Sequence, residues 1–220
     1  MPARQRISTI CTTFEEEARL AGYSAVTGLD EVGRGALAGP VVAAAVIMDP
    51  LKPFPEGLDD SKKLDRPKRE RIAAELRENA IAFAVGQIEA DEIDRINILQ
   101  ATFRAMLAAL ANLNLKPDYL LIDAVKLKEC SLPQRSIIRG DSISASIAAA
   151  SVIAKVFRDG LMREQHKIYP QYSFDSHVGY GTRTHLAALR EHGACPLHRR
   201  SFRGVLDDVD VAEATDESDD

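Results

Sequence analysis

Residues 25–35 read AVTGLDEVGRG, an apolar run that ends in Asp30 and Glu31 and then passes into an arginine flanked by glycines. The apolar part predicts a buried strand, so the two carboxylates stand where that strand ends. Ionised carboxylates are costly to remove from water unless something pairs with them. A divalent cation is one such partner, because Mg²⁺ prefers oxygen ligands and keeps coordination positions open for a phosphate. The alternative is that both acids are ordinary solvated residues at the start of a turn.

The loop that follows these acids places Arg34 between Gly33 and Gly35. Because glycine has no side chain, a substrate backbone could approach this loop closely. The alternative is that both glycines only supply positive φ angles in a turn. The loop is therefore a candidate binding element beside the candidate carboxylates.

Two further apolar segments also end in an acid. Residues 119–123 end in Asp123, and residues 136–141 repeat the pattern and end in Asp141. If these strands are neighbours in one sheet, their acids converge on one edge, where like charges repel unless a cation lies between them. Two metal ions roughly 4 Å apart would neutralise the acids and clamp the attacking and leaving oxygens of a phosphoryl displacement. Asp141 has an alternative role, since it could cap a helix that begins at Ser142.

Periodicity and capping signals place the other elements. Strands are expected at residues 25–30, 41–48 and 82–88, and helices at 13–20, 65–79, 91–113, 143–161 and 182–192. Thr13 and Glu16 predict a capping box at the start of the first helix. Strands come first and helices alternate with strands later, which predicts an α/β fold with a mixed sheet flanked by helices. We expect one domain over residues 1–204 with a helical C-terminal segment.

Composition favours a chain that folds alone inside the cell. The chain has 220 residues and is 45% hydrophobic, which suffices for one large core. Its longest apolar run, Val41 to Met48, is far too short to cross a membrane, and acids at 15–17 stand where a signal peptide would be apolar. Three widely spaced cysteines without a Cys-x-x-Cys pair argue against disulfides and a structural zinc. We expect a cytoplasmic protein without a membrane partner.

Charge is distributed unevenly along the chain. Residues 205–220 hold eight acids and no base, so the remainder has 28 bases and 25 of the 33 acids, a charge of +3. Such an acidic segment is typical of a disordered tail. Two basic runs, at residues 62–71 and 198–203, could track a phosphate backbone, although the first could equally be a solvated helix face.

A few single residues stand out by their surroundings. Tyr180 lies between two glycines, so its ring either contacts something outside the fold or packs as an ordinary loop residue. Asp159 follows an arginine within an expected helix and is interpreted as an ion-pair partner. His177, His185 and His192 lie in polar stretches and are interpreted as bystanders.

The ordered set of motifs resembles bacterial ribonuclease HII, the type 2 ribonuclease H family. The matching motifs cover about residues 25 to 203 and are DEVGRG at 30–35, DSKKL at 60–64, INIL at 96–99, LID at 121–123, GDS at 140–142, ASVIAKV at 150–156 with Arg158-Asp159, Gly179-Tyr180 and HRRSF at 198–202. One departure is Val178, where relatives often carry a lysine, so no phosphate contact is assigned there. The acidic tail also has no counterpart in the resemblance.

This resemblance implies a ribonuclease H-like fold and an endonuclease that uses two divalent ions, magnesium or manganese. It would cut the RNA strand of RNA-DNA hybrids and cut on the 5' side of single ribonucleotides in duplex DNA, as ribonucleotide excision repair requires, leaving 3'-hydroxyl and 5'-phosphate ends. The family's metal-binding and catalytic positions fall on Asp30, Glu31, Asp123 and Asp141.

The resemblance also implies how the substrate is bound. Gly33, Arg34 and Gly35 would sense the ribose 2'-hydroxyl, Tyr180 would stack on the neighbouring deoxyribose, and Lys62 would lie near the phosphates. Recognition of the 2'-hydroxyl agrees with a glycine-flanked loop that a substrate can approach closely, because only this hydroxyl separates RNA from DNA at a single nucleotide. We expect a monomer whose partners are hybrid and ribonucleotide-containing duplexes.

Two other functions compete with this interpretation. A dinucleotide-binding oxidoreductase is possible because the glycines at 33, 35 and 39 mimic a pyrophosphate loop, but such a loop must open a helix. A non-catalytic module that binds hybrids would need the basic runs but not the four acids. Magnesium-dependent turnover separates this last alternative from a nuclease.

Overall fold

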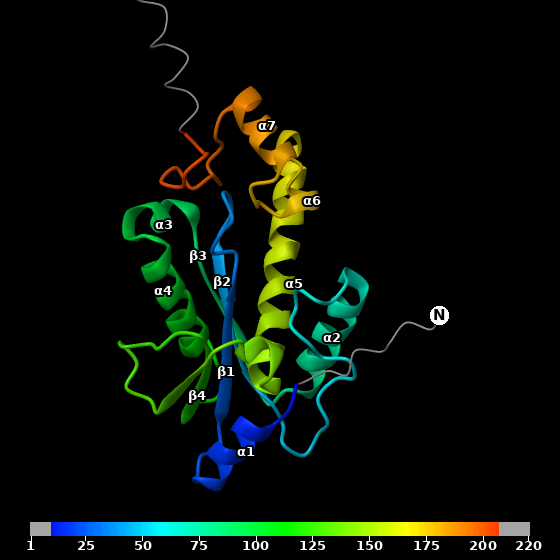
Figure 1. The fold of residues 1–220 in the computed structure, drawn as a ribbon, viewed down its shortest axis with the longest axis vertical. Helices are drawn as coiled ribbons and strands as arrows, with labels where there is room; N and C mark the ends of the chain where they lie inside the picture. The colour runs from blue at the N-terminus through cyan, green and yellow to red at the C-terminus, as the bar shows by residue number, and fades with distance from the viewer. Residues whose placement is uncertain (1–9, 207–220) are drawn as a thin grey trace, which may run out of the picture.

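The computed structural model describes residues 10–206 and is built around a five-stranded sheet in the order β3-β2-β1-β4-β5. The strands are β1 (Val26–Val32), β2 (Val41–Ile47), β3 (Ala82–Ile88), β4 (Tyr119–Asp123) and β5 (Gln134–Ile137). β1 lies at the centre of the sheet, with β2 on one side and β4 on the other, and it runs through the middle of Figure 1. The strands that were expected to end in Asp30 and Asp123 are therefore direct neighbours.

The sheet is mixed, as predicted. β1, β4 and β5 are parallel to one another, whereas β1 with β2 and β2 with β3 are antiparallel. Because β1 and β2 form an antiparallel hairpin, the glycine-rich loop between them leads into a strand. The dinucleotide-binding alternative is wrong for this reason, since that loop opens no helix.

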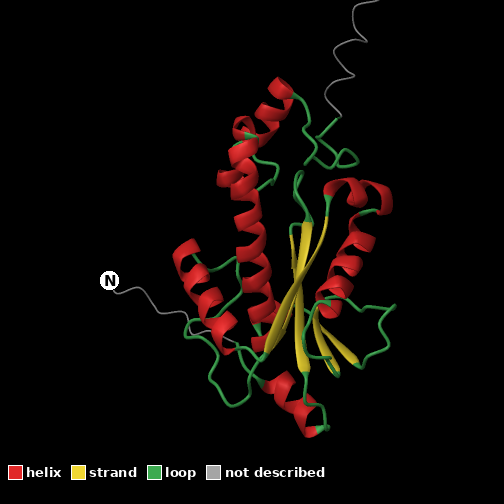
Figure 2. Ribbon diagram, turned by 180° about the vertical axis from the view of Figure 1, so that it is seen from behind, coloured by secondary structure: helices red, strands yellow, loops and turns green. Residues whose placement is uncertain are grey.

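Helices cover both faces of the sheet (Figure 2). One face packs against α5 (Ala145–Ile168), which in turn contacts α2 (Arg66–Asn79). The other face packs against α4 (Ile98–Ala111), preceded by α3 (Ala90–Ile96). β2 is buried along its whole length because it contributes side chains to both cores.

Two further groups of helices close the ends of the sheet. The N-terminal helix is α1 (Thr13–Leu20), and the C-terminal segment contains α6 (Phe174–His177), α7 (Arg183–His192) and a 3-10 turn at Pro170–Tyr172. This C-terminal segment has its own apolar cluster and lies at the upper end of α5 in Figure 1. The expected helical C-terminal segment is confirmed.

A glycine in β1 decides how closely α5 approaches the sheet. A Cβ atom at Gly28 would stand 2.2 Å from the backbone carbonyl carbon of Ser146, so a side chain at this position would collide with α5. The backbone of α5 therefore packs directly on β1. This contact brings the middle of α5, including Ser151, alongside the end of β1.

The expected helix at 91–113 is in fact two helices. The helical conformation is interrupted at Asn97, whose φ angle is +69°. The Asn97 side chain accepts hydrogen bonds from Leu99 N and Gln100 N at the start of α4. Asparagine is a good N-cap, and the positive φ angle at this residue cannot continue a right-handed helix, which explains the break. The buried face of α4 includes Ala105 and Met106, whereas Leu99 at its start is 43% exposed.

The expected strand at 136–141 is also wrong. β5 ends at Ile137, and Asp141 lies beyond it in a 3-10 turn over Gly140–Ser142. The following helix starts at Ala145 and its N-cap is Ser144, whose hydroxyl accepts from Ile147 N. Asp141 is therefore not a helix cap.

Two terminal predictions need correction. The capping box at Thr13 and Glu16 does not form, because Thr12 is the N-cap and its side chain makes no capping hydrogen bond. Val205 was assigned to the acidic tail but is buried in the C-terminal cluster, so a tail would start beyond it. Residues 207–220 lie outside the described part of the chain. None of the helices between residues 10 and 206 combines the length and apolar character of a transmembrane segment.

Candidate active site

The carboxyl ends of the parallel strands bring three acids together. Leu29 of β1 pairs with Ile122 of β4, and each immediately precedes an acid, so Asp30 and Asp123 lie side by side. β1 does not end at Asp30 as expected but continues to Val32. Asp141 reaches the same edge through the turn after β5, where the N–H of the preceding residue, Gly140, donates to Asp123 Oδ1 at 2.7 Å. The structure thus places these three residues at one edge of the sheet, and their role as metal ligands stays a prediction.

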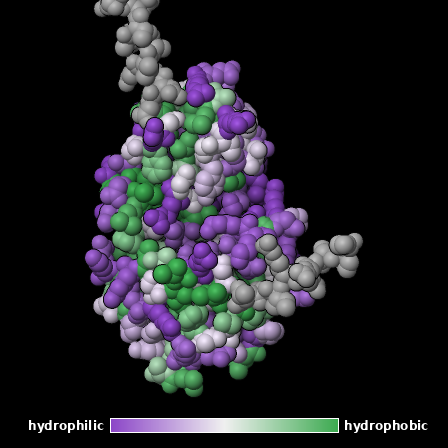
Figure 3. Space-filling view, viewed as in Figure 1, coloured by the Kyte–Doolittle hydropathy of each residue, from purple (hydrophilic) through white to green (hydrophobic). Residues whose placement is uncertain are grey.

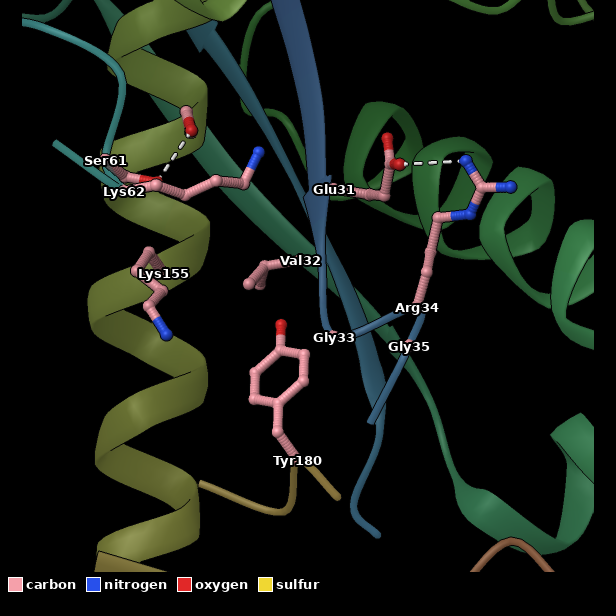
Figure 4. Close-up of a pocket in the computed structure, with 10 residues that line it drawn as sticks. Glu31, Val32, Gly33, Arg34, Gly35, Ser61, Lys62, Lys155 and Tyr180 are labelled. Atoms are coloured by element: carbon pink, nitrogen blue, oxygen red, sulfur yellow. Dashed lines mark hydrogen bonds and ion pairs between the residues drawn. The ribbon is translucent and has the colours of Figure 1, made fainter. Parts of the chain in front are cut away.

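Glu31 points to a different side from Asp30, because successive side chains of a strand alternate between faces. Asp30 is directed at α5 and accepts a hydrogen bond from Ser151, whereas Glu31 Oε1 accepts from Arg34 Nη1 at 3.2 Å. Figure 4 shows Glu31 and Arg34 on the opposite side of β1 from Lys62. The two adjacent acids therefore flank the end of β1 rather than forming one chelating pair.

Burial and negative neighbours raise the pKa values of three candidate acids. Burial raises the pKa of Asp30 well above its usual value, and the charges of Glu31 and Asp123 add to the effect. Burial also raises the pKa of Glu31, although Arg34 opposes the shift. The pKa of Asp123 is raised by burial despite the hydrogen bond from Gly140 N–H. In this arrangement the positive charges of Arg34 and Lys62 do not offset the burial of these carboxylates.

Lys62 is the cation that faces the acids from the opposite side. Its Nζ lies 3.5 Å from Asp141 Oδ2, while its side chain remains 75% exposed. Burial lowers the pKa of Lys62, but the charges of Asp141, Asp60 and Asp30 outweigh this and raise it. Elsewhere in the first basic run, Lys63 Nζ donates to Ser142 Oγ at 3.1 Å, beside Asp141, whereas Arg66 pairs with a glutamate one turn later. Lys62 is thus the member of that run whose ammonium pairs with a candidate acid.

Two observations test whether these residues fit a divalent metal. Glu31 Oε2 is buried without a hydrogen-bond partner, and carboxylates are the oxygen ligands that a hard cation prefers. In the described part of the chain, no three potential ligands already form a cluster that could hold one ion. Asp123 is turned toward Gly140 N–H and Asp141 toward Lys62. The residues fit a divalent cation in charge and ligand type, and binding would draw both aspartates away from these partners.

A pocket adjoins the acids and is lined by the predicted substrate-binding residues. It has a volume of about 360 Å³, and its lining includes Gly33, Lys62, Lys155 and Tyr180. In Figure 4 the Tyr180 hydroxyl points into the space between β1 and α5. Lys62 also lines a second hollow, on the side of Asp123, so the two hollows meet at this lysine. Together they form a path past the acids.

The Gly-Arg-Gly loop contributes backbone to the pocket. Gly33 has a φ angle of +89°, which favours glycine, and a Cβ atom there would stand 2.2 Å from Arg158 Nε. Gly35 has open space around it, so no steric reason requires glycine there. The Arg34 side chain is turned toward Glu31 and away from Tyr180 (Figure 4). Of Gly33, Arg34 and Gly35, only Gly33 must be a glycine because of its backbone conformation and its neighbours.

Two residues of α5 were not predicted as site residues: Lys155, which lines this pocket, and Arg158, which lies behind Tyr180. Lys155 forms an ion pair with Asp159 at 2.8 Å, which confirms the ion-pair interpretation of Asp159, although that pair is largely buried. Lys155 and Arg158 both lie within 6 Å of the Tyr180 ring centroid, at 5.8 Å and 5.5 Å. Their two positive charges within the largely apolar helix predicted at 143–161 were the signal that could have identified them.

The interpretation of the histidines as bystanders in polar surroundings is wrong for two of them. His177 and His185 are buried and stack with ring centroids 4.5 Å apart, whereas His192 is exposed. His185 Nε2 lies 3.0 Å from Nε2 of His198, which is also buried. His198 belongs to the second basic run, and Arg199 in that run is fully buried, so this run does not form an exposed phosphate track. Both corrections follow from the C-terminal segment folding over the end of α5.

The face of the molecule seen in Figure 1 carries both hydrophilic and hydrophobic surface. In the space-filling view, hydrophilic residues spread over the part of this face on which α5 and α2 lie, and a hydrophobic patch lies in its lower middle (Figure 3).

The mixed sheet with acids at the carboxyl edge of its parallel strands defines a nuclease of the ribonuclease H-like fold class. Comparison with family models identifies the family within this fold class. The model of the family "Ribonuclease HII" matches residues 27–205, and this chain belongs to that family. It is therefore a hydrolase with ribonuclease H activity on RNA-DNA substrates rather than a non-catalytic binding module.

Sequence relatives cover most of the chain. Ribonuclease HII of Desulfitobacterium hafniense is 53% identical over 197 residues, which is 90% of this chain and 75% of that protein. Ribonuclease HII of Geobacter metallireducens is 52% identical over 197 residues, which is 90% of this chain and 92% of that protein.

Solved structures share the fold. Ribonuclease H2 of Pyrococcus horikoshii superposes with a TM-score of 0.68 at 25% identity, over 82% of this chain and 94% of that one. The Archaeoglobus fulgidus ribonuclease HII, solved in complex with PCNA, gives a TM-score of 0.71 at 23% identity, over 82% and 96%. Bst ribonuclease HIII, solved in complex with Mn²⁺, gives 0.62 at 21% identity, over 86% and 70%. The ribonuclease H-like fold is thereby confirmed.

Proposed function

We propose that this chain hydrolyses the phosphodiester on the 5' side of a ribonucleotide, both in RNA-DNA hybrids and at single ribonucleotides in duplex DNA. The products would carry 3'-hydroxyl and 5'-phosphate ends. The observation that carries the proposal is the position of the acids at the sheet edge, directly beside a pocket lined by Gly33, Lys62 and Tyr180. Because one 2'-hydroxyl is all that marks such a substrate, the discriminating contacts must lie within reach of the bond that is cut.

Two divalent ions, Mg²⁺ or Mn²⁺, are the proposed cofactors, with Asp30, Glu31, Asp123 and Asp141 as ligands and catalytic groups. When bound, such ions supply an activated water and stabilise charge on the attacking and leaving oxygens. The raised pKa values of three of the acids support this assignment, since burial disfavours their ionised forms and a bound cation would offset that cost. Glu31 Oε2, buried without a hydrogen-bond partner, is a further free ligand atom.

Substrate contacts are proposed for the residues around the pocket. The backbone at Gly33 and Gly35 would meet the ribose 2'-hydroxyl, and the Tyr180 ring would stack on the adjoining deoxyribose. Lys62 would neutralise a phosphate, because its exposed ammonium already lies beside the acids. Arg34 would act through its backbone and as a counter-charge to Glu31, toward which its guanidinium is turned.

The direct test uses a DNA duplex that contains one embedded ribonucleotide, incubated with Mg²⁺, with Mn²⁺ and with chelator. Cleavage on the 5' side of the ribonucleotide, only when metal is present, is the expected result. Analysis of the ends distinguishes a 5'-phosphate from other products. Intact substrate after long incubation with either metal would refute the proposal.

The Asp123→Asn variant should lose turnover but keep hybrid binding. An amide preserves the shape of the side chain and removes the charge that would hold the metal, so a loss of at least about a thousandfold is expected. Cleavage assays and fluorescence anisotropy of a labelled hybrid measure the two properties separately. Asp91→Asn, in a surface ion pair with Arg95, is the matched control. Activity of Asp123→Asn within a few-fold of the parent would show that Asp123 is not a ligand.

A monomer in the cytoplasm is the proposed working state. All three cysteines are free, as suits a reducing compartment. Light scattering of the purified chain should give a mass near 24.1 kDa, and a mass near twice this value would contradict the monomer.

A further inference from the structure

Arg158, in the middle of α5, is a buried arginine that holds two chain segments together. Its side chain is 0% exposed. Its Nε donates to the carbonyl of Pro40 at 2.9 Å and its Nη2 to that of Ala38 at 3.0 Å, both in the stretch between β1 and β2. Its Nη1 donates to the carbonyl of Val178 at 2.9 Å, two residues before Tyr180. One planar group therefore joins segments far apart in the sequence.

The same guanidinium touches both elements assigned to substrate recognition. A Cβ atom at Gly33 would stand 2.2 Å from Arg158 Nε, so the backbone of Gly33 rests on the guanidinium. Arg158 Cζ also lies 5.5 Å from the centroid of the Tyr180 ring. The spacing between loop and ring is thus set by a rigid fork of donors, which a lysine with one flexible ammonium cannot reproduce.

No carboxylate pairs with Arg158 among the residues that the structure describes. The adjacent acid, Asp159, pairs with Lys155 instead. The three acceptors of Arg158 are neutral backbone carbonyls. A buried cation without a counter-charge leaves positive potential at the base of the pocket, which favours a polyanionic ligand.

Backbone strain next to Tyr180 supports a functional reason for this contact. Val178 has a φ angle of +46°, a left-handed conformation that is unfavourable for a β-branched residue. Such strain persists only where the surroundings enforce it, and it concentrates at functional sites. The hydrogen bond from Arg158 to the Val178 carbonyl is one contact that enforces it.

We propose that Arg158 is a positioning residue that holds Gly33 and Tyr180 at the spacing needed to read a ribonucleotide followed by a deoxyribonucleotide. It touches no reacting atom and acts through these two residues. The inference rests on the proposed function, because it takes both as substrate contacts. A uniform RNA-DNA hybrid lacks this junction, so the substrate with one embedded ribonucleotide should depend more strongly on Arg158.

The test compares Arg158→Lys and Arg158→Gln with the parent on both substrates. The measured quantity is the ratio of kcat/KM on the embedded ribonucleotide to kcat/KM on the uniform hybrid. We expect this ratio to fall about tenfold, because small misplacements of binding groups have large effects on rate. Arg163→Lys is the control, since Arg163 also lies in α5 but pairs with Glu70, and it lines neither hollow beside the acids. It should leave both rates and their ratio within about twofold of the parent.

A double-mutant cycle shows whether Arg158 acts through the ring. In a Tyr180→Ala background, Arg158→Lys should change the ratio by less than about twofold, because the ring it positions is absent. Assays are run at a temperature at which circular dichroism shows each variant to be folded. An unchanged ratio in both Arg158 variants, or the same drop with and without Tyr180, would overturn the inference. Failure of both variants to fold at any temperature would also overturn it, since Arg158 would then be a residue of the fold.

The parent assay separates this inference from the proposed function. If the parent leaves the embedded ribonucleotide intact, the proposed function fails. If the parent cuts it and the Arg158 variants keep the parent's ratio, only the positioning role fails.

Discussion

At the scale of single residues, the site depends on what lies behind each substrate-facing group. Tyr180 projects into the pocket from a loop held at both ends. Its N–H donates to the carbonyl of His177 at 3.0 Å, and its carbonyl lies 3.0 Å from His185 Nδ1. Two cationic side chains of α5 lie against its ring. The ring is therefore held in place before any substrate arrives.

Tyr180 should act through its ring rather than its hydroxyl. Stacking needs only an aromatic face, so Tyr180→Phe should keep activity near that of the parent. Tyr180→Ala should lose about tenfold or more, because loss of a stacking ring costs roughly 1 to 3 kcal/mol and 1.4 kcal/mol is a factor of ten. The loss should be steepest on a single embedded ribonucleotide, measured as kcat/KM against a uniform hybrid. Equal activity of the alanine variant and the parent on both substrates would return Tyr180 to the role of a loop residue.

At the scale of elements, α5 organises the site, and its N-terminus is held by an acid from α1. Glu15 is 1% exposed, and its Oε1 accepts from Ser144 Oγ at 2.7 Å, Ser146 N at 2.8 Å and Ser146 Oγ at 2.6 Å. A carboxylate is favourable at this end of a helix because of the helix dipole. Since α5 carries Ser151 and Lys155 to the pocket, this anchor fixes the site from a distance.

Glu15→Ala should therefore destabilise the protein. It leaves a buried backbone N–H at Ser146 without its acceptor, which typically costs about 1 to 3 kcal/mol. Urea denaturation followed by circular dichroism measures the change in the free energy of unfolding. Glu16→Ala, at an exposed neighbouring position, should change it by less than about 0.5 kcal/mol. Equal stability of the two variants would show that α5 does not depend on this anchor.

At the scale of the whole molecule, the buried histidines make stability depend on pH. Burial, with the neighbouring His185, lowers the pKa of His198 from 6.5 to about 4, and burial also lowers the pKa values of His177 and His185. The folded state therefore holds these imidazoles neutral, whereas the unfolded chain protonates them below about pH 6.5. Because the unfolded state binds more protons in this window, stability is fully present above pH 6.5 and is lost as the pH falls toward 4.

Thermal unfolding at a series of pH values checks this expectation. The parent Tm should fall between pH 7 and pH 4.5, and His198→Asn should lower the Tm at pH 7 but flatten its dependence on pH. His192→Asn, on the exposed face of α7, should keep the slope of the parent. Parallel curves for His198→Asn and the parent would show that His198 is not the group responsible.

Charge outside the described residues also bears on the whole molecule. All eight acids of the predicted tail fall within residues 207–220. Deletion of residues 207–220, with the buried Val205 retained, should leave kcat unchanged and tighten hybrid binding. The reason is that the deletion removes negative charge from a protein that must approach a polyanion. The gain should be largest near 0.01 M salt, where the Debye length is about 30 Å. Anisotropy titrations at two salt concentrations measure it, and weaker binding or a loss of folding would contradict the tail assignment.

The order of the expected strands and helices predicted the mixed sheet, and the apolar runs before Asp30 and Asp123 predicted two strands, because these signals are local. Pairing of the two strands places the acids side by side, although Asp30 lies within β1 and not at its end. The opposite directions of Asp30 and Glu31 were also implicit in the sequence, since side chains alternate along a strand. The helix break at Asn97 was signalled only by the residue type, which is a weak signal within an apolar stripe.

The positions of the other site residues depend on tertiary contacts that local sequence patterns do not report. Asp141 reaches the site through a turn beyond β5, and that turn is fixed by the contact between Gly140 N–H and Asp123, far apart in the sequence. Arg158 and Arg199 read as basic residues of a helix and a basic run, yet both are fully buried on backbone carbonyls of the β1–β2 loop. A local sequence pattern predicts helices, strands and their buried faces, but not the long-range partner of a side chain. Which carbonyls meet a guanidinium depends on segments that come together only when the chain has folded.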